Sequence, residues 1–230
     1  ECLYTGEKSG WLASLSPEEM QQFTKLRKSV ESCDVELLQK DGLYKGQFGN
    51  WSGIWHCARD GWSAMPGHGH QDIGSCELMY SDTLILVDPG RDRYGDGNKE
   101  QKYILPSEHS SLMINNQASF PLNKPYYNKD FREKVCGPIP TFINKKNSVH
   151  IGHQGFSRLS NVGSYFRNWV FEDRLVRIED DVEGTAKVNI VRYLQTPIKP
   201  KVEDEKIILV QGNSTFRIAS ELPENFIIEP

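Results

Sequence analysis

Apolar residues near the start of the chain recur at the spacing of one helix face. In residues 20–30 they stand three or four positions apart, with polar and charged residues between them. Ser16 is placed to cap a helix, Pro17 suits the first helical position, and Glu19 completes a capping box with Ser16. The pattern therefore predicts a short helix.

From about Leu43 the pattern changes to short alternating or apolar runs, separated by Gly, Asn, Asp and Pro. The run "AKVNIVRYLQ" predicts one strand, and residues 121–140, rich in Pro, Asn, Lys and Tyr, predict a long loop. Three pairs of runs flank candidate two-residue turns: "CELMY" and "TLILVD" around Ser81-Asp82, "SYFRNWVF" and "RLVRIEDD" around Glu172-Asp173, and "KIILVQ" and "STFRIAS" around Gly212-Asn213.

Many antiparallel strands without intervening helices indicate an all-β fold, an antiparallel β-sandwich with a short N-terminal helical segment. We expect residues 43–230 to form the β-sandwich domain, while the helix within residues 1–42 is either a cap on the sandwich or the last helix of a preceding helical domain. The 230 residues are 37% hydrophobic and 25% charged, which is enough apolar material for a packed core.

Composition also bears on the partners. No apolar run approaches the roughly 20 residues of a membrane helix, so no membrane insertion is expected. The formal net charge of -4 argues against nucleic acid as a partner. The opening "ECLYTGEKSGW" has neither the basic start nor the apolar core of a signal peptide, and a first residue Glu1 indicates a processed product or a fragment.

One cluster of basic residues is able to receive an anionic sugar polymer, although solvated hairpin charges are the commoner explanation. Its members are Arg91, Arg93, Lys99 and Lys102.

The cysteines and tryptophans are predicted to be core residues rather than members of a functional site. The five cysteines are scattered and form no CxxC pair, so neither a disulfide framework nor a cysteine zinc site is expected. Cys57 and Cys76 stand among apolar neighbours and are predicted to be small core residues. Trp51, Trp55 and Trp62 are predicted to pack in the core rather than to line a sugar platform.

The stretch "GHGHQD" sets two histidines between glycines, which leave room for close approach of backbone or ligand. In an extended segment His68 and His70 face the same side. Asp88 ends the apolar run "TLILVD", and a two-residue turn would place it opposite Ser75 and fold it back toward His70. His109 stands at the start of another predicted strand.

Two histidines and one carboxylate, with an open fourth position, are a recognised zinc set, and other divalent first-row metals accept the same ligands. Spacing alone does not separate the roles of His68 and His70, and an isolated histidine is more often an ordinary hydrogen-bonded residue. A cupin-like site is excluded, because it needs a glutamate three or four residues after the second histidine, and here the next is Glu77.

Other polar residues carry weaker signals. Asp72 is either a partner that orients an imidazole or a turn residue that bonds its own backbone. His56 lies in a predicted strand and is expected to be a packed histidine. His150 and His153 are spaced to opposite faces of a strand and are not expected to form a site. Tyr94 either stacks on a sugar or packs, with packing favoured.

Four stretches, in order, resemble the heparinase II/III-like C-terminal domain: "GHGHQD", "LILVDPG", the tyrosine-bearing turn "RDRYGDG" and "SEHSSLMINN". The later "FRNWVFEDRLVRIEDDVEG" is similar to that family's aromatic strand followed by "I-D-x-V-x-G", and the resemblance spans about residues 45–195. Members are polysaccharide lyases and relatives associated with exopolysaccharide gene sets. Their architecture joins a helical (α/α) toroid to a C-terminal β-sandwich, which implies that residues 1–42 are a linker to the toroid or its edge.

The resemblance also assigns roles. His68 corresponds to the family's catalytic histidine, and one divalent metal, expected to be zinc, corresponds to a mainly structural ion held by His70, Asp88 and His109. Three further residues are candidate contacts to an anionic polysaccharide: Arg91, Arg93 and Tyr94.

The implied activity is β-elimination beside a uronate. A base removes the proton at C5 and an acid protonates the oxygen that leaves C4, while hydrogen bonds neutralise the carboxylate. His68 is the expected base or positioning group. The family's tyrosine acid and its asparagine or histidine neutraliser lie on the toroid, so no turnover is expected from residues 1–230 alone. The resemblance also favours the periplasm or the cell exterior.

The chain departs from the family's lyases around His109. Many of them carry an arginine shortly before this position and a threonine or asparagine after it, whereas here Pro106, Ser107 and Glu108 precede it and Ser110 follows. This departure keeps an alternative open, a non-catalytic carbohydrate-binding or exopolysaccharide biosynthesis-associated module. A third class is a metal-dependent hydrolase, whose metal would face the substrate.

Overall fold

The computed structural model describes residues 15–30, 39–58, 70–90, 104–121, 128–137, 140–185 and 187–220. The chain divides into two compact units, Glu1–Lys40 and Asp41–Pro230. Among the described residues, no helix has the length and apolar character needed to cross a membrane.

In the first unit, helix α1 spans Pro17–Val30, as predicted. The capping box is formed in both directions. The Ser16 N–H donates to Glu19 Oε2 over 2.8 Å, and the Glu19 N–H donates to Ser16 Oγ over 3.3 Å. These bonds satisfy two of the backbone donors that a helix start leaves without partners, so the local sequence is sufficient to set where α1 begins.

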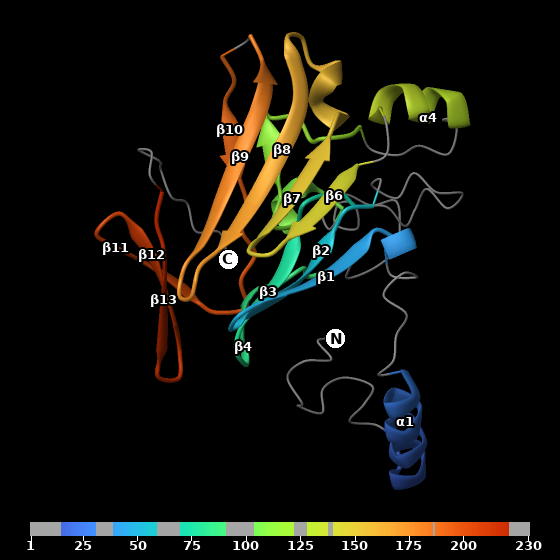
Figure 1. The fold of residues 1–230 in the computed structure, drawn as a ribbon, viewed down its shortest axis with the longest axis vertical. Coiled ribbons are helices and arrows are strands. Elements are labelled where there is room, and N and C mark those ends of the chain that lie inside the picture. The colour runs from blue at the N-terminus through green and yellow to red at the C-terminus, as the bar shows by residue number, and fades with distance from the viewer. Residues whose placement is uncertain are drawn as a thin grey trace. The chain divides into compact units, whose positions relative to one another are not determined.

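The second unit is built from antiparallel sheets, which confirms the predicted β-sandwich class (Figure 1). One four-stranded sheet has the order β1-β2-β3-β4 and another has the order β6-β7-β8-β9, while β11-β12-β13 and β10-β5 form smaller sheets. The strands are β1 (Leu43–Phe48), β2 (Trp51–His56), β3 (Cys76–Tyr80), β4 (Thr83–Leu86), β5 (Leu112–Ile114), β6 (Thr141–Lys145), β7 (Ser148–His153), β8 (Val162–Phe171), β9 (Val176–Gly184), β10 (Ile190–Arg192), β11 (Pro200–Glu203), β12 (Lys206–Gln211) and β13 (Ser214–Ile218).

The hairpin predictions hold to different degrees. The β12–β13 turn is the predicted two-residue turn, with Gly212 at φ +57. The β8–β9 prediction was wrong in register, because Phe171 pairs with Val176 and the loop therefore has four residues. In the β3–β4 hairpin an irregularity between Leu78 and Met79 shifts the pairing by one residue from the predicted register.

Two other predictions need correction. The segment 121–140 was predicted to be a loop, but it contains helix α4, Lys129–Cys136. Asn128 caps α4, since its side-chain oxygen accepts the Phe131 N–H over 2.8 Å. The run "AKVNIVRYLQ" forms only the three-residue strand β10, because pairing with the short β5 limits its length. Short 3-10 turns also occur at η3 (Pro106–Glu108) and η4 (Gly155–Arg158).

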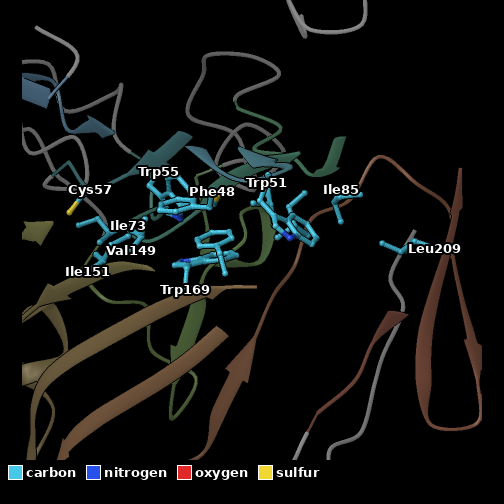
Figure 2. Packing of buried hydrophobic residues seen from close by; sticks show 14 of the residues in the cluster. Phe48, Trp51, Trp55, Cys57, Ile73, Ile85, Val149, Ile151, Trp169 and Leu209 are labelled. Carbon is cyan, nitrogen blue, oxygen red and sulfur yellow. The ribbon is translucent and has the colours of Figure 1, made fainter. Parts of the chain in front are cut away.

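The main core lies between the β1–β4 and β6–β9 sheets. Trp55 on β2 and Trp169 on β8 meet edge to face at 6.2 Å, and Phe48 stacks on Phe171 at 4.2 Å. Figure 2 shows Trp55 and Phe48 approaching Trp169 between the strands. The predicted core residues Trp51, Trp55, Cys57 and Cys76 are all buried here, whereas Trp62 lies outside the described residues.

His153, at the end of β7, is a buried histidine of a second, smaller core. It is 5% exposed, and its ring lies 4.9 Å from that of Tyr165 and 5.6 Å from that of Phe156. Its Nδ1 accepts the Gly155 N–H over 3.1 Å. Burial, together with the nearby Arg167 charge, lowers the pKa of His153 to about 3.

This pKa predicts a loss of stability in mild acid. In the unfolded chain His153 takes up a proton near pH 6.5, whereas in the folded chain it stays neutral. The contribution of His153 to the free energy of unfolding therefore falls as pH drops from about 6.5 toward 3. Between pH 7 and pH 5 the expected loss is about 2 kcal/mol. A His153→Gln variant keeps an acceptor for the Gly155 N–H but does not titrate. Urea unfolding at both pH values should show a smaller loss in the variant, and equal losses would contradict a neutral buried His153.

Candidate metal centre

Five polar side chains lie close together at one edge of the β1–β4 sheet, where β2 ends, β3 begins and β4 ends. His56 is the last residue of β2, Asp72 and His70 precede β3, and Asp88 follows β4 by two residues. Because the strands are antiparallel, with Trp55 paired to Cys76, these ends lie together.

His109 joins the same cluster from the 3-10 turn η3, which is far along the chain. Asp72 belongs to two sets of mutually close donors. Within each set the ligand atoms lie within 4.8 Å of one another: His70, Asp72 and His109 form one, and His56, Asp72 and Asp88 form the other.

The contact between His109 and Asp88 is the best buried of the cluster. His109 Nδ1 lies 3.1 Å from Asp88 Oδ1 and 3.0 Å from Oδ2. The two side chains are 0% and 4% exposed. The His70 ring stacks on the His109 ring at 5.1 Å and 28°. Nδ1 of His109 and the Asp88 carboxylate therefore lie close enough to serve as two donors to one ion.

A second histidine–aspartate pair lies beside the first. His56 Nδ1 is 3.1 Å from Asp72 Oδ2, and both side chains are about one-fifth exposed. Burial alone would lower the pKa of His56, but the hydrogen bond and charge of Asp72, together with Asp88 and Glu77, raise it to about 9. Burial likewise opposes ionisation of Asp88, yet His109 holds the pKa of that carboxyl well below its ordinary value.

The donor set suits a divalent cation. Two carboxylates and up to three imidazoles converge, and nitrogen and oxygen donors of these kinds bind zinc and other first-row divalent ions. At neutral pH a protonated His56 offsets one of the two negative charges of Asp72 and Asp88, and a divalent ion would neutralise the charge that remains. Burying two carboxylates this close together is costly without such positive charge, so the residues present fit the predicted metal.

Ser75 ties the segments of the centre together. Its hydroxyl donates to Asp88 Oδ2 over 2.9 Å and accepts the Ser110 N–H over 3.2 Å. The predicted neighbourhood of Ser75 and Asp88 is therefore present despite the shifted β3–β4 register. Asp88 also receives the Gly90 N–H at Oδ1 over 3.0 Å. Three groups from three segments of chain, Ser75, Gly90 and His109, thus contact the Asp88 carboxylate.

The structure brings three predicted metal ligands into one cluster: His70, Asp88 and His109. The tight set that contains both His70 and His109 includes Asp72 as its carboxylate, so Asp72 is closer to the centre than the sequence indicated. Four other predicted site residues lie outside the described residues: His68, Arg91, Arg93 and Tyr94.

Sequence reasoning missed His56, which was expected to be a packed histidine. A signal was present, because alternation along β2 puts Trp51, Gly53 and Trp55 on the buried face and His56 on the other. For Asp72, the structure shows the imidazole partner that the sequence left open. His150 and His153 lie on opposite faces of β7, as their spacing predicted, with His153 on the buried face.

The model of the family described as "Heparinase II/III-like, C-terminal" matches residues 32–229. This match covers most of the chain. The chain belongs to this heparinase II/III-like C-terminal family. No curated protein matches it in sequence.

Solved structures of similar fold include a heparan sulfate lyase and a heparinase III. The heparan sulfate lyase HepC from Pedobacter heparinus has a TM-score of 0.56 at 17% identity, covering 80% of this chain and 28% of that one. The heparinase III BT4657 gene product, with methylated lysines, has a TM-score of 0.53 at 15% identity, covering 85% and 32%. The chain therefore spans about a third or less of these enzymes, and the likeness concerns the fold.

The role of Ser75 predicts a stability cost for its removal. In Ser75→Ala the buried Ser110 N–H loses its acceptor and Asp88 loses a donor, so the free energy of unfolding should fall by about 1–3 kcal/mol. Ser214→Ala, at an exposed position of β13, is the matched control and should change stability by less than about 0.5 kcal/mol. Equal effects of the two variants in urea unfolding would contradict a stabilising role for the Ser75 hydrogen bonds to Asp88 and Ser110.

Proposed function

We propose that this domain is the C-terminal part of a polysaccharide lyase that cleaves a uronic-acid-containing polymer by β-elimination. We further propose that it holds one divalent metal, expected to be zinc, through His70, Asp88 and His109, with Asp72 as a further donor. The single observation that supports this most is the largely buried convergence of histidines and aspartates from segments as far apart in sequence as those of His56 and His109. Membership of the family supports the reaction class.

The metal's contribution would be electrostatic and structural. When bound, the ion supplies two positive charges to the carboxylates and connects the segments before β3, after β4 and after η3. The residues of the chain do the rest. Ser75 and the Gly90 N–H orient Asp88, and His56 orients Asp72.

His68 is proposed as the group that acts on the substrate. It precedes His70 by two residues, so a fixed His70 would restrain where the His68 imidazole can lie. There it would take the C5 proton of the uronate or position the base that does. Arg91, Arg93 and Tyr94 follow Asp88 closely in sequence and are proposed to contact the anionic polymer.

The remaining groups of the reaction are proposed to come from a preceding helical domain, with residues 1–42 as its edge or linker and residues 43–230 as the β-sandwich. Such a domain would supply the acid that protonates the oxygen leaving C4 and the donor that neutralises the uronate carboxylate. The chain's coverage of only 28% and 32% of the similar lyases leaves room for that domain.

A second candidate function is a non-catalytic carbohydrate-binding module that keeps the metal for stability. The observation that favours it is Glu108, a partly exposed carboxylate directly before His109. A negative charge at this position would repel a uronate polymer approaching the centre. In that case the domain would bind sugar without forming unsaturated products.

Metal content tests the ligand set. Elemental mass spectrometry of the purified protein should give about one equivalent of zinc or another divalent metal. His70→Ala, Asp88→Ala and His109→Ala should each lose most of it and melt at a lower temperature, because an ion that binds only the folded state stabilises it. His150→Ala and Asp181→Ala, on the far face of the β6–β9 sheet, are controls that should keep it. Retention of metal in Asp88→Ala but loss in Asp72→Ala would contradict Asp88 as a ligand.

The catalytic proposal is tested in the chain that includes the helical domain. His68→Ala should lower the formation of unsaturated uronate product by a factor of about 100 or more while metal content stays near one equivalent, since general bases contribute this much to rate. His70→Ala should reduce both metal and product. A full-length chain that binds uronate polymer but releases no unsaturated product would favour the non-catalytic module instead.

A further inference from the structure

Arg167 is a charged residue in the interior of the β-sandwich. It lies in the middle of β8, in phase with the buried Tyr165, Trp169 and Phe171, and is 0% exposed. A guanidinium cannot shed its charge in a protein, so at this depth it requires an anion and acceptors for its five N–H donors. The hydrogen-bond partners of Arg167 therefore indicate which parts of the chain it holds in position.

One side of the Arg167 guanidinium is paired with Asp180 on the neighbouring strand β9. Nε donates to Asp180 Oδ1 over 2.7 Å, and Nη2 donates to Oδ2 over 3.2 Å, which is a two-point contact. Asp180 is itself held by the Tyr165 hydroxyl and by Arg192 Nε at 2.6 Å. The anion is thus fixed from three side chains, and it orients the plane of the guanidinium.

The other side of Arg167 reaches the two segments that carry the metal-centre residues. Nη1 donates to the Ser110 carbonyl over 2.8 Å and to the Gly74 carbonyl over 3.4 Å. Ser110 directly follows His109, and Gly74 lies two residues after Asp72. Nη1 of Arg167 therefore holds the backbone next to His109 and the backbone near Asp72 at the same time.

A second connection runs from Asp180 to the same region. Arg192 is the last residue of β10, and it pairs with Leu112 of β5, three residues after His109. Asp180 thus acts as an anchor for two arginines that approach the His109 segment from different strands. The β6–β9 sheet supplies the rigid frame, and the segments of the metal centre are attached to it through polar contacts.

Stability alone is a weak reason for such a group. Removing two charges from water costs so much that buried ion pairs can often be replaced by well-packed apolar side chains without loss of stability. The directional bonds to two carbonyls are what an apolar side chain would not provide. Arg167 therefore matters for the relative position of two backbone segments more than for the burial of surface.

We propose that Arg167, oriented by Asp180, is a positioning residue that sets the spacing between the His70–Asp72 segment and His109 and thereby tunes the affinity and geometry of the metal centre. The proposal rests on the proposed function, because it requires that a metal binds there. Partners of this kind beyond the direct ligands typically change metal affinity by about 10–100-fold when they are removed.

Arg167→Lys is the sharpest variant, because it keeps the positive charge beside Asp180 but has a single ammonium that cannot hold Asp180 and both carbonyls in one plane. Asp180→Asn is the second variant, since it leaves Arg167 in place and weakens its anchor. Leu209→Ala, a buried position on β12, is a control for lowered stability, and Arg177→Lys, a partly exposed arginine on β9, is a control for the chemical change.

The experiment measures zinc affinity by chelator competition and records the visible spectrum of the Co2+-loaded protein, at a temperature where every metal-free variant is folded. The expected result is zinc binding weakened about tenfold or more in Arg167→Lys and less in Asp180→Asn, with a changed Co2+ spectrum. Leu209→Ala and Arg177→Lys should keep the wild-type affinity and spectrum even where melting temperature falls. If Arg167→Lys does not fold, the Asp180→Asn spectrum and affinity decide the question.

Two results would overturn the proposal, and they differ from failure of the proposed function. Wild-type affinity and spectrum in both Arg167→Lys and Asp180→Asn would show that the arginine does not position the ligands, while the metal centre itself would stand. An affinity loss in Leu209→Ala as large as that in Arg167→Lys would assign the effect to general destabilisation. A wild-type protein that takes up neither zinc nor Co2+ would overturn the metal centre and this inference together.

Discussion

The buried contact between His109 and Asp88 is the interaction on which the rest of the site depends. A carboxylate and an imidazole at 3.0 Å, both withdrawn from water, have a defined geometry only if every remaining donor and acceptor around them is satisfied. Ser75 and the Gly90 N–H meet that requirement for Asp88. The surrounding segments are therefore constrained to one arrangement, and this arrangement collects the donors of a metal centre.

The β-sandwich makes this arrangement possible through the shared position of strand ends. Antiparallel pairing places the end of β2, the start of β3 and the end of β4 on one side of the sheet, so short sequence segments deliver His56, Asp72 and Asp88 to one place. The aromatic core around Trp55 and Trp169 fixes the two large sheets against each other. Arg167, on β8 of the second sheet, donates to the Gly74 and Ser110 carbonyls and so connects this sheet to the segments of the metal centre.

Much of this was predictable from local patterns, and the remainder depended on contacts distant in sequence. Gly212 and the Ser16 capping box specify their turn and helix start through neighbouring residues, so those predictions hold. Helix α4 was missed because its Pro- and Asn-rich flanks resemble a loop, and the β3–β4 irregularity has no local signal. The partnership of His56 with Asp72, and of Arg167 with the Ser110 carbonyl, arises only when segments up to 57 residues apart meet. An arginine in phase with Tyr165 and Trp169 was nevertheless a visible sign of a buried charge.

The most direct test of the central claim is the zinc-edge X-ray absorption spectrum of the zinc-loaded protein. It reports the ligands of the ion without reference to activity or stability. The expected spectrum shows only nitrogen and oxygen neighbours at about 2.0–2.2 Å, with the outer scattering of two imidazoles. A sulfur neighbour at about 2.3 Å, or a spectrum without imidazole scattering, would contradict a centre built from His70, His109 and the buried aspartates.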